Sequence, residues 1–237
     1  MSSTAPNKPR RTALIPVAAT VGGLLVCAVP AVASAQDINW TVGVASEYMG
    51  KGAGESNGEI APFGQVEVGA GQVYASVFAS TAELSSGADS ELVTTIGWRP
   101  TAGDVKFDLA ILNRDLPGSR VGVDSNYFEY QADATRAFGR FTTRLRVNYS
   151  PDGFAATQEA WWIELQGSTA LDSRTKASIA IADRSADGGA EYTAWNAGVK
   201  RKLTDDVSLD LRWYDTDGHD LGEPYEGRLV GSISFAF

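Results

Sequence analysis

Apolar and polar residues alternate in short runs from Asp37 to the carboxy terminus, and no stretch keeps the three-to-four spacing of an amphipathic helix for long. The run 206–215 shows the pattern most clearly. One of its faces carries Val207, Leu209, Leu211 and Trp213, and the other carries Ser208, Asp210, Arg212 and Tyr214. Successive Cβ atoms of a strand point to opposite faces, so a strand separates these two sets. The chain is therefore predicted to be all β.

About twelve such runs follow one another, separated by clusters of Gly, Asp, Ser and Pro. They cover 39–48, 60–69, 72–82, 91–100, 104–112, 126–137, 140–149, 159–170, 174–183, 191–202, 206–215 and 226–237. Strands of soluble proteins cluster near about five or six residues, whereas a tilted strand that spans a bilayer needs about nine to eleven. The runs have the greater length, which favours strands that cross a membrane.

The connections between the runs alternate between short and long. Short ones fall at 70–71, 101–103, 138–139, 171–173 and 203–205, and long ones near 49–59, 83–90, 113–125, 150–158, 184–190 and 216–225. With both termini on the short-turn side the strand number is even, as in bacterial barrels with short periplasmic turns and longer extracellular loops. We therefore expect a closed, antiparallel, up-and-down transmembrane β-barrel of about twelve strands in the outer membrane of a Gram-negative-type envelope.

Aromatic residues gather at the ends of the runs, as expected for side chains that favour membrane interfaces. Tyr48, Phe63, Tyr127, Tyr149, Trp161 and Tyr214 would lie near the outer rim, and Trp40, Trp98, Phe141, Phe235 and Phe237 near the periplasmic rim. The alternative is a secreted soluble β-sandwich with these rings in its core. Alternation of apolar and polar residues alone fits both folds, whereas sorted loops favour the barrel.

The amino-terminal segment has the order of a signal peptide: basic residues Lys8, Arg10 and Arg11, an apolar stretch over 13–29, and Ala33-Ser34-Ala35. Prolines and glycines interrupt the apolar stretch, which falls short of the roughly 20 apolar residues of a membrane-spanning helix. We expect residues 1–35 to be removed on export through the periplasm and residues 36–237 to form one barrel domain.

Removal of residues 1–35 makes the chain more acidic and cysteine-free. It takes away three basic residues and no acidic one, which leaves 17 basic against 29 acidic residues and changes the formal net charge from −9 to −12. Nucleic acid is therefore not an expected partner, because phosphate binding depends on clustered Lys and Arg. The only cysteine, Cys27, lies in the removed segment, so disulfides and thiolate metal sites are excluded.

Several segments resemble the TorF-type family of porins of the bacterial outer membrane. The segment 44–52 resembles the family's first strand and arginine-glycine loop, with Met49 and Lys51 in place of the usual aromatic residue and arginine. Segments 148–152, 192–199, 214–217 and 227–237 also match its pattern, each over a short stretch. The resemblance implies a membrane-embedded barrel with a presumed pore.

The carboxy terminus resembles the signal by which outer-membrane proteins are recognised for insertion. Phe237 is the last residue, and Phe235 and Ile233 share its face. The resemblance implies that the barrel-assembly machinery and outer-membrane lipid are partners of this chain. Its oligomeric state does not follow from the sequence.

Charged residues fall on the faces opposite the aliphatic ones, and a lipid-facing Arg or Lys at the membrane midplane would cost about 2–4 kcal/mol. We therefore expect them to line the lumen. A two-residue turn at 138–139 would set Asp133 opposite Arg144 and Gln131 opposite Arg146. The predicted lumen residues are Arg99, Lys106, Asp108, Glu129, Asp133, Arg144, Arg146, Glu164, Lys200, Asp210 and Arg212.

Two interpretations of this lining remain open. The charges could select solutes in an open pore, or they could pair and fill the interior, because about twelve strands lie between filled and open barrels. The first makes the protein a channel for passive passage of small hydrophilic solutes, and the second a structural or surface-binding barrel with a closed lumen. Acids and bases are nearly balanced, so no ion preference is predicted.

The loop around the single histidine, His219, carries alternating carboxylates at Asp215, Asp217 and Asp220. These resemble calcium loops, but complete EF-hand spacing is absent, so a solvated acidic turn is favoured and no metal site is predicted. A barrel hydrolase would need a serine beside a histidine, and none is paired with His219. No enzymatic activity and no cofactor are therefore expected.

Overall fold

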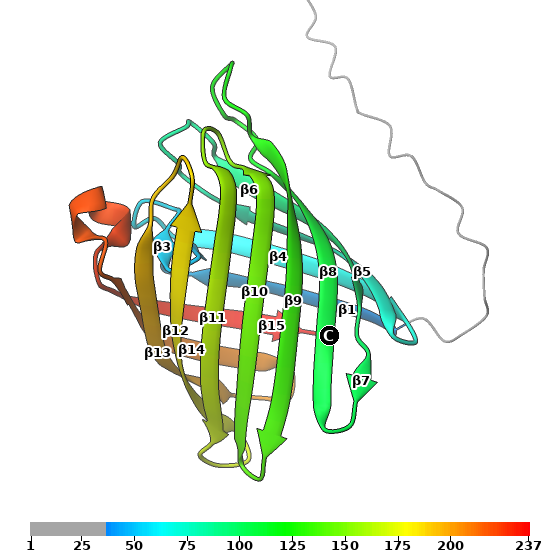
Figure 1. Ribbon diagram of the computed structural model, residues 1–237. Coiled ribbons are helices and arrows are strands. Elements are labelled where there is room, and N and C mark those ends of the chain that lie inside the picture. The colour runs from blue at the N-terminus through cyan, green and yellow to red at the C-terminus, as the bar shows by residue number, and fades with distance from the viewer. Residues whose placement is uncertain (1–36) are drawn as a thin grey trace, which may run out of the picture. The chain divides into compact units, whose positions relative to one another are not determined.

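The computed structural model describes residues 37–237, so the predicted signal peptide lies outside the described residues. Long antiparallel strands form one closed sheet (Figure 1). They are β1 (Asp37–Ala45), β4 (Ala61–Ala70), β5 (Val73–Thr81), β6 (Ser90–Trp98), its continuation β7 (Thr101–Ala102), β8 (Val105–Asp115), β9 (Asn126–Phe138), β10 (Phe141–Gly153), β11 (Gln158–Ala170), β12 (Thr175–Ala186), β13 (Tyr192–Lys202), β14 (Val207–Thr216) and β15 (Arg228–Ala236).

Each long strand pairs with its neighbours in sequence, and β1 pairs with β15 to close the ring. β6 and β7 are one strand in two pieces, because both pair with β8 in the same register. The gap falls at Pro100, which has no N–H to donate to the ladder. The closed antiparallel barrel of twelve strands predicted from the sequence is thus confirmed.

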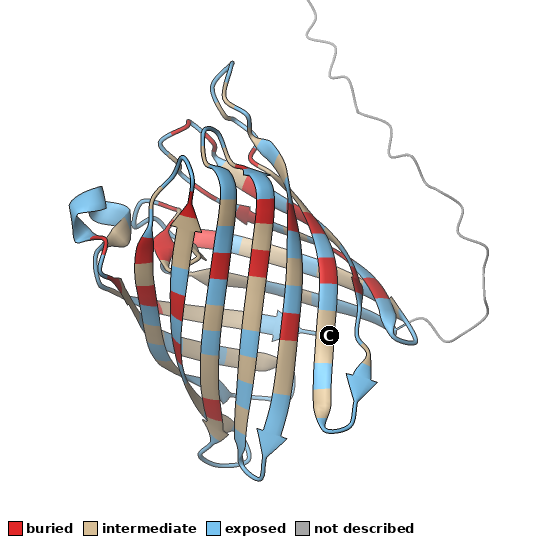
Figure 2. Cartoon of the chain, in the orientation of Figure 1, coloured by how far each residue is buried: buried red, intermediate tan, exposed pale blue. Residues whose placement is uncertain are grey.

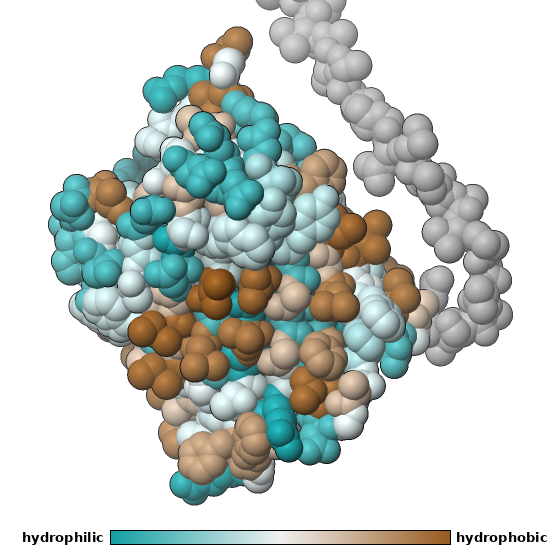
Figure 3. Space-filling model, viewed as in Figure 1, coloured by the Kyte–Doolittle hydropathy of each residue, from teal (hydrophilic) through white to brown (hydrophobic). Residues whose placement is uncertain are grey.

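The two faces of the strands separate as the alternation predicts, and Figure 2 shows exposed and less exposed residues alternating along them. On β14, Leu209, Leu211 and Trp213 are exposed on the outside, whereas Asp210 and Arg212 point inward. Aliphatic side chains gather in a band around the strands, with hydrophilic residues at the loop end (Figure 3). The barrel therefore presents its apolar side chains outward.

The interior holds two small apolar clusters. One consists of Trp162, Tyr192 and neighbouring alanines, and the other of Val93, Ala110 and Leu112. No helix in residues 37–237 has the length and hydropathy to cross a membrane. Because the two apolar clusters are small, the closed ladder of backbone hydrogen bonds and the polar contacts inside it hold most of the fold.

Three short turns place glycine first in the loop. In Gly71-Gln72, Gly103-Asp104 and Gly139-Arg140, the glycine has a positive φ of 58 to 63°. A two-residue hairpin with glycine at its first central position matches the right-handed twist of the flanking strands. Two of these turns therefore lie one residue later than the predicted 70–71 and 138–139, and the predicted three-residue turn 101–103 is the two-residue turn Gly103-Asp104.

This shift corrects the cross-strand pairing predicted between β9 and β10. Asp133 lies opposite Arg146 rather than Arg144, and Gln131 lies opposite Asn148 rather than Arg146. The shift moves each partner by two positions, so every side chain keeps its predicted face. The predicted turn includes Phe138, whereas in the structure Phe138 pairs with Phe141 at the end of the ladder.

The opposite end carries the longer loops. The first contains the short hairpin β2 (Met49–Gly50) and β3 (Ala53–Gly54), and the last contains the 3₁₀ helices η1 (His219–Leu221) and η2 (Glu223–Tyr225). The connection predicted near 150–158 is only 154–157, because β10 continues through a bulge after Ser150. The short and long connections otherwise alternate around the barrel as expected.

The predicted aromatic rims are partly wrong. Trp40, Trp98, Phe141, Phe235 and Phe237 are exposed at the short-turn end, and Tyr149 packs at a tilt against the exposed Trp161 near the loop end. Tyr48, Tyr127 and Tyr214 instead line the interior, and Phe63 packs inside against Phe78. The alternation already implied this for Tyr127 and Tyr214, which share faces with Glu129 and Arg212.

Candidate functional site in the barrel interior

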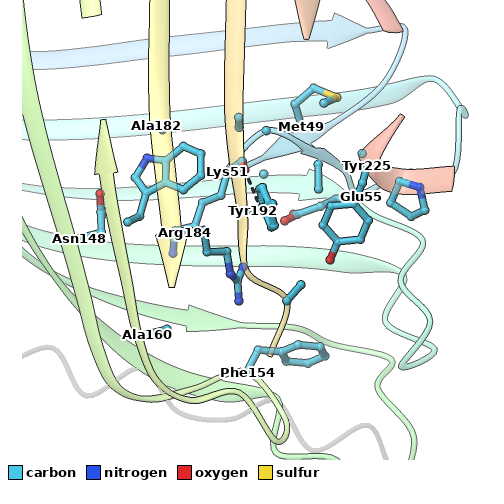
Figure 4. Close-up of a pocket in the computed structure, with 18 of the residues that line it drawn as sticks. Met49, Lys51, Glu55, Asn148, Phe154, Ala160, Ala182, Arg184, Tyr192 and Tyr225 are labelled. Atoms are coloured by element: carbon cyan, nitrogen blue, oxygen red, sulfur yellow. Dashed lines mark hydrogen bonds between the residues drawn. The ribbon is translucent and has the colours of Figure 1, made fainter. Parts of the chain in front are cut away.

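The barrel encloses a cavity of about 890 Å³ near its loop end (Figure 4). Strands β8 to β14 supply most of its wall, and the loop that carries β2 and β3, residues 83–85, Glu91 of β6 and residues of the other long loops supply the rest. Its lining is largely charged, polar and aromatic. This cavity lies within the range of about 300–1,000 Å³ typical of small-molecule sites.

The β2–β3 hairpin reaches across the interior to the opposite wall. The hydroxyl of Tyr192 donates a hydrogen bond of 2.8 Å to the carbonyl oxygen of Lys51, and the Lys51 ammonium forms an ion pair with Glu129. Gly52 has a φ of +85°, and a Cβ atom there would lie 2.6 Å from the Cβ of Ala194. Only glycine therefore fits the hairpin tip in this close approach to β13.

The base of the hairpin is held as well. Arg228 Nη1 lies 2.6 Å from Glu47 Oε1, and the backbone N–H of Tyr48 donates to Ser56 Oγ at 2.9 Å. The N–H of Glu83, in the next loop, donates to the carbonyl oxygen of Glu55 at 2.7 Å. The hairpin is therefore fixed at both ends and narrows the lumen.

Burial changes the acidity of two groups on this hairpin. It lowers the pKa of the Lys51 ammonium, and the neighbouring Glu129 carboxylate opposes that change. Burial, with repulsion from Glu91, raises the pKa of Glu55 to about 7. The Glu55 carboxyl therefore changes charge near neutral pH.

Glu129, which is completely buried, is the centre of a network below the hairpin. It accepts a hydrogen bond from Asn148 Nδ2 at 2.7 Å, and Arg114 Nε lies 3.5 Å away. Arg114 also pairs with Glu91 at 2.5 Å, and the hydroxyl of Tyr48 donates to the other oxygen of Glu91. The network connects β6, β8, β9 and β10 with the hairpin.

Further ion pairs cross neighbouring strands. Arg146 donates two hydrogen bonds to Asp133, at 2.8 and 2.6 Å, and Arg144 pairs with Glu164. Bidentate geometry of this kind is the strongest form of the guanidinium–carboxylate contact. These side chains are ordered by one another and form a fixed lining.

A third group lies toward the short turns. Arg99 donates two hydrogen bonds to Glu67, at 2.7 and 2.8 Å, and one to Asp108 at 3.1 Å. Its guanidinium also lies 3.6 Å from the centre of the Tyr74 ring, and the Tyr74 hydroxyl donates to Asp108 at 2.8 Å. Tyr74 in turn lies against Gly97, where a Cβ atom would come within 2.2 Å of the ring.

The structure places the eleven lumen residues named from the sequence on inward-facing positions. Arg212 donates to Asn196 at 2.7 Å and to Ser178 at 2.9 Å, and lies 3.4 Å from Asp210. Lys106 and Lys200 lie toward the short turns. Among residues 37–237, no carboxylate oxygen lies within 4 Å of the ammonium group of either lysine. The remaining seven form the pairs described above.

Sequence reasoning missed several charged residues that line the cavity. Arg114 and Arg184 lie at inward positions of the alternation, but the predicted runs end before them, at 112 and 183, whereas β8 and β12 continue to Asp115 and Ala186. Lys51 and Glu55 belong to a loop, for which alternation carries no information. Extending each strand until its alternation stopped would have found the two arginines.

The acidic loop lies outside this cavity. Asp215 Oδ1 lies 2.8 Å from His219 Nε2, Asp217 Oδ1 accepts from the N–H of Thr193 at 2.7 Å, and Asp220 is exposed. The hydrogen bond from Asp215 raises the pKa of His219. Within residues 37–237, no three His, Cys, Asp or Glu side chains are grouped so as to hold a metal ion.

The carboxy-terminal residues lie at the short-turn end. Phe235 and Phe237 are exposed on the outer surface, and the backbone of Phe237 exchanges hydrogen bonds of 2.9 and 3.1 Å with Trp40 of β1. The last residues therefore complete the closure of the barrel. Their side chains remain available to surroundings outside the ring.

Comparison with solved structures shows the same fold in porins. The chain matches a structure described as "KdgM porin" with a TM-score of 0.58 and 7% identity, over 86% of this chain and 99% of that one. It matches a NanC porin structure with a TM-score of 0.57 and 9% identity, over 85% and 99% of the two chains. At these identities the likeness shows the fold alone.

Sequence comparison gives a family without a function. No curated protein sequence matches the chain. The TorF-type resemblance stays a prediction, because the matching family model does not carry that name. That model covers residues 30–228, which is most of the chain, and the protein therefore belongs to the Gcw_chp family, described as bacterial proteins of unknown function.

Proposed function

We propose that this protein is an outer-membrane channel through which small hydrophilic solutes pass passively. The observation that carries the proposal is the combination of an outward aliphatic surface with a charged cavity of about 890 Å³ inside the same barrel. Aliphatic residues such as Ile96 and Ile179, 68% and 63% exposed, would be costly on a water-soluble barrel. They are favourable against lipid, which leaves the charged face for water.

The resemblance to porins in fold supports this proposal. The structures matched above are porins by their own descriptions, and their barrels superpose on nearly their whole length. Export through the periplasm, insertion guided by Phe235 and Phe237, and a resting place in the outer membrane belong to the same proposal. Small solutes and lipid are then the partners, and catalysis has no part in it.

The hairpin favours a second candidate, a barrel whose lumen is closed. The contacts of Lys51 with Glu129 and of Tyr192 with the Lys51 carbonyl hold the hairpin across the interior. A twelve-stranded barrel lies between filled eight-stranded and open sixteen-stranded ones, so one inserted loop has a large effect on its passage. In this case the protein would be structural or would bind partners at its surface.

Planar bilayer recording of protein purified from outer membranes separates the two candidates. The channel proposal expects single-channel steps from the unmodified protein, and larger steps when residues 49–54 are replaced by a short Gly-Ser linker. The matched control replaces 119–124, six residues of the β8–β9 loop that do not line the cavity, and should leave the steps unchanged. Silence of the unmodified protein after proven insertion, with steps from the hairpin variant, would establish the closed barrel instead.

Location is tested separately by heat-modifiable gel mobility of the membrane fraction. A folded barrel in detergent should migrate differently before and after boiling. Recovery of the protein in the periplasm without detergent would contradict the membrane assignment and the channel with it.

A further inference from the structure

We propose that the interior selects anions and that the wall formed by β12, β13 and β14 binds small organic carboxylates, with Arg184 as the principal binding residue. This inference rests on the proposed channel function, whose solute class it names. It is carried by the uneven distribution of charge around the inner wall and by a guanidinium in the cavity that has no carboxylate oxygen within 4 Å among residues 37–237.

The inward-facing residues of β12, β13 and β14 are strongly basic. Along these strands, the inner face carries five cations and one carboxylate. The cations are Lys176, Arg184, Lys200, Lys202 and Arg212, and the carboxylate is Asp210. The formal net charge of the whole protein is −9, so the excess of positive charge on this wall has the opposite sign to the net charge.

The other walls show no such excess. From β8 to β11, the inner face has four cations and four carboxylates, and from β4 to β7 it has one cation and two carboxylates. The first set is Lys106, Arg114, Arg144, Arg146, Asp108, Glu129, Asp133 and Glu164, and the second is Arg99, Glu67 and Glu91. The strands β15 and β1 add one cation and one carboxylate, Arg228 and Asp37. Positive charge is therefore concentrated along one side of the lumen, where it would attract and guide anions.

Arg184 is the cation of this wall that faces the main cavity without an acidic partner. Within residues 37–237, no carboxylate oxygen lies within 4 Å of its guanidinium, and its buried Nε has no hydrogen-bond acceptor. The guanidinium lies 5.9 Å from the centre of the Tyr192 ring, and Figure 4 shows it beside Lys51. Glu55 lines the same cavity and attracts Arg184, but forms no ion pair with it within 4 Å. A guanidinium without a direct ion pair in a partly desolvated cavity is unfavourable, and an anionic ligand would pair with it.

The surroundings of Arg184 favour an organic carboxylate over a simple inorganic ion. A guanidinium offers parallel N–H donors that match the two oxygens of a carboxylate. Trp162 and Tyr192 form an aromatic surface beside it, against which a carbon skeleton can pack. Toward the short turns the wall carries small residues, including Ala182, Ala180 and Gly198, which leave room for passage.

A second basic group lies at the other end of the same wall. Lys176 stands directly opposite Lys200 in the β12–β13 ladder, and like charges in that position repel each other. On its other side Lys200 stands opposite Asp210 of β14, with which it forms no ion pair within 4 Å. Together with Lys202 they line a cavity of about 330 Å³ near the short turns. Lys176 and Arg184 are eight residues apart on one strand, which is roughly 26 Å. The basic wall therefore extends along most of the barrel.

Bilayer recording in a tenfold KCl gradient tests the selectivity. The reversal potential of the unmodified protein should lie between zero and the equilibrium potential of chloride. Lys176→Gln combined with Lys200→Gln should shift the reversal potential toward the equilibrium potential of potassium. The matched control is Arg201→Gln, which removes the same charge from the outward face of β13 and should change nothing. Cation selectivity of the unmodified protein would overturn the inference while leaving the channel proposal intact.

Binding is measured independently of conductance by titration calorimetry of the purified barrel in detergent. Succinate should bind, and Arg184→Gln should weaken its binding about tenfold or more, whereas succinamide, the neutral analogue, should not bind. Phosphate should bind more weakly than succinate. Equal affinity of Arg184→Gln and Arg201→Gln for succinate, or no binding to the unmodified protein, would overturn the role of Arg184 even if channels are seen.

Discussion

Replacement of Leu165 by arginine places a charge on the outward face at mid-strand. Leu165 is 54% exposed on β11, lies between Leu145 and Ile181 of the adjacent strands, and is four residues from the outer-rim Trp161. If this face meets acyl chains, the guanidinium is forced into the middle of the hydrocarbon. The expected loss of folding free energy is about 2–4 kcal/mol.

The matched control is Leu171→Arg, in the short turn at the end of the same strand, where the leucine is 60% exposed. Six residues correspond to roughly 20 Å along a strand and, at a tilt of about 40°, to roughly 15 Å along the membrane normal. That exceeds half of the apolar band of about 25 Å, so the cost at this depth falls to about 0–1 kcal/mol. The two variants therefore differ mainly in the depth of the introduced arginine in the membrane.

Reversible urea unfolding in lipid vesicles, followed by tryptophan fluorescence, measures both variants. The expected difference is a folding constant lower by roughly 30-fold to 900-fold for Leu165→Arg than for the original protein. Equal stability of the Leu165→Arg and Leu171→Arg proteins would refute the argument, because a solvated sheet face tolerates arginine at any height.

Three further substitutions test the interior. Glu55→Gln should stabilise the protein above pH 7 and leave its stability unchanged below about pH 4.5. The reason is that the pKa of Glu55 is raised to about 7 in the folded protein, so that ionisation of this carboxyl disfavours folding. Urea midpoints measured across this pH range check the expectation. Gly97→Val should destabilise by about 1–3 kcal/mol in the same assay, since its side chain would overlap the Tyr74 ring, and no change would contradict that packing. Asp133→Asn should cost about 1–3 kcal/mol, less than a fully buried pair, because 30% of the Arg146 side chain is exposed; a smaller loss would show that the pair is not a structural contact.

The fold could be predicted almost entirely from the sequence because one pattern repeats at every strand. Alternation of period two fixes which side chains share a face, and the sorting of short and long connections fixes the up-and-down order. The remaining errors are local. The turn at Gly139 was placed one residue early because the positive φ of a glycine, and not the hydrophobic pattern, decides where a hairpin turns.

The interior could be predicted only in part. Alternation assigns Asp133 and Arg146 to the inner face, but it does not tell which charges pair, since pairing depends on register across neighbouring strands. The position of Lys51 depends on a loop that folds into the lumen, and its contact with Glu129 joins residues 78 positions apart in the sequence. Unpaired groups such as Arg184 become visible only when all partners have coordinates.

The central claim is that the aliphatic face of the strands meets lipid and the charged face meets water. Because Cys27, the only cysteine, lies in the segment expected to be removed, single cysteines can be placed along β11 at 161–168 and spin-labelled in vesicles. The account predicts that collision with oxygen is high at 161, 163, 165 and 167 and that collision with a water-soluble nickel complex is high at the positions between them. High nickel accessibility at 163 and 165 would contradict the account.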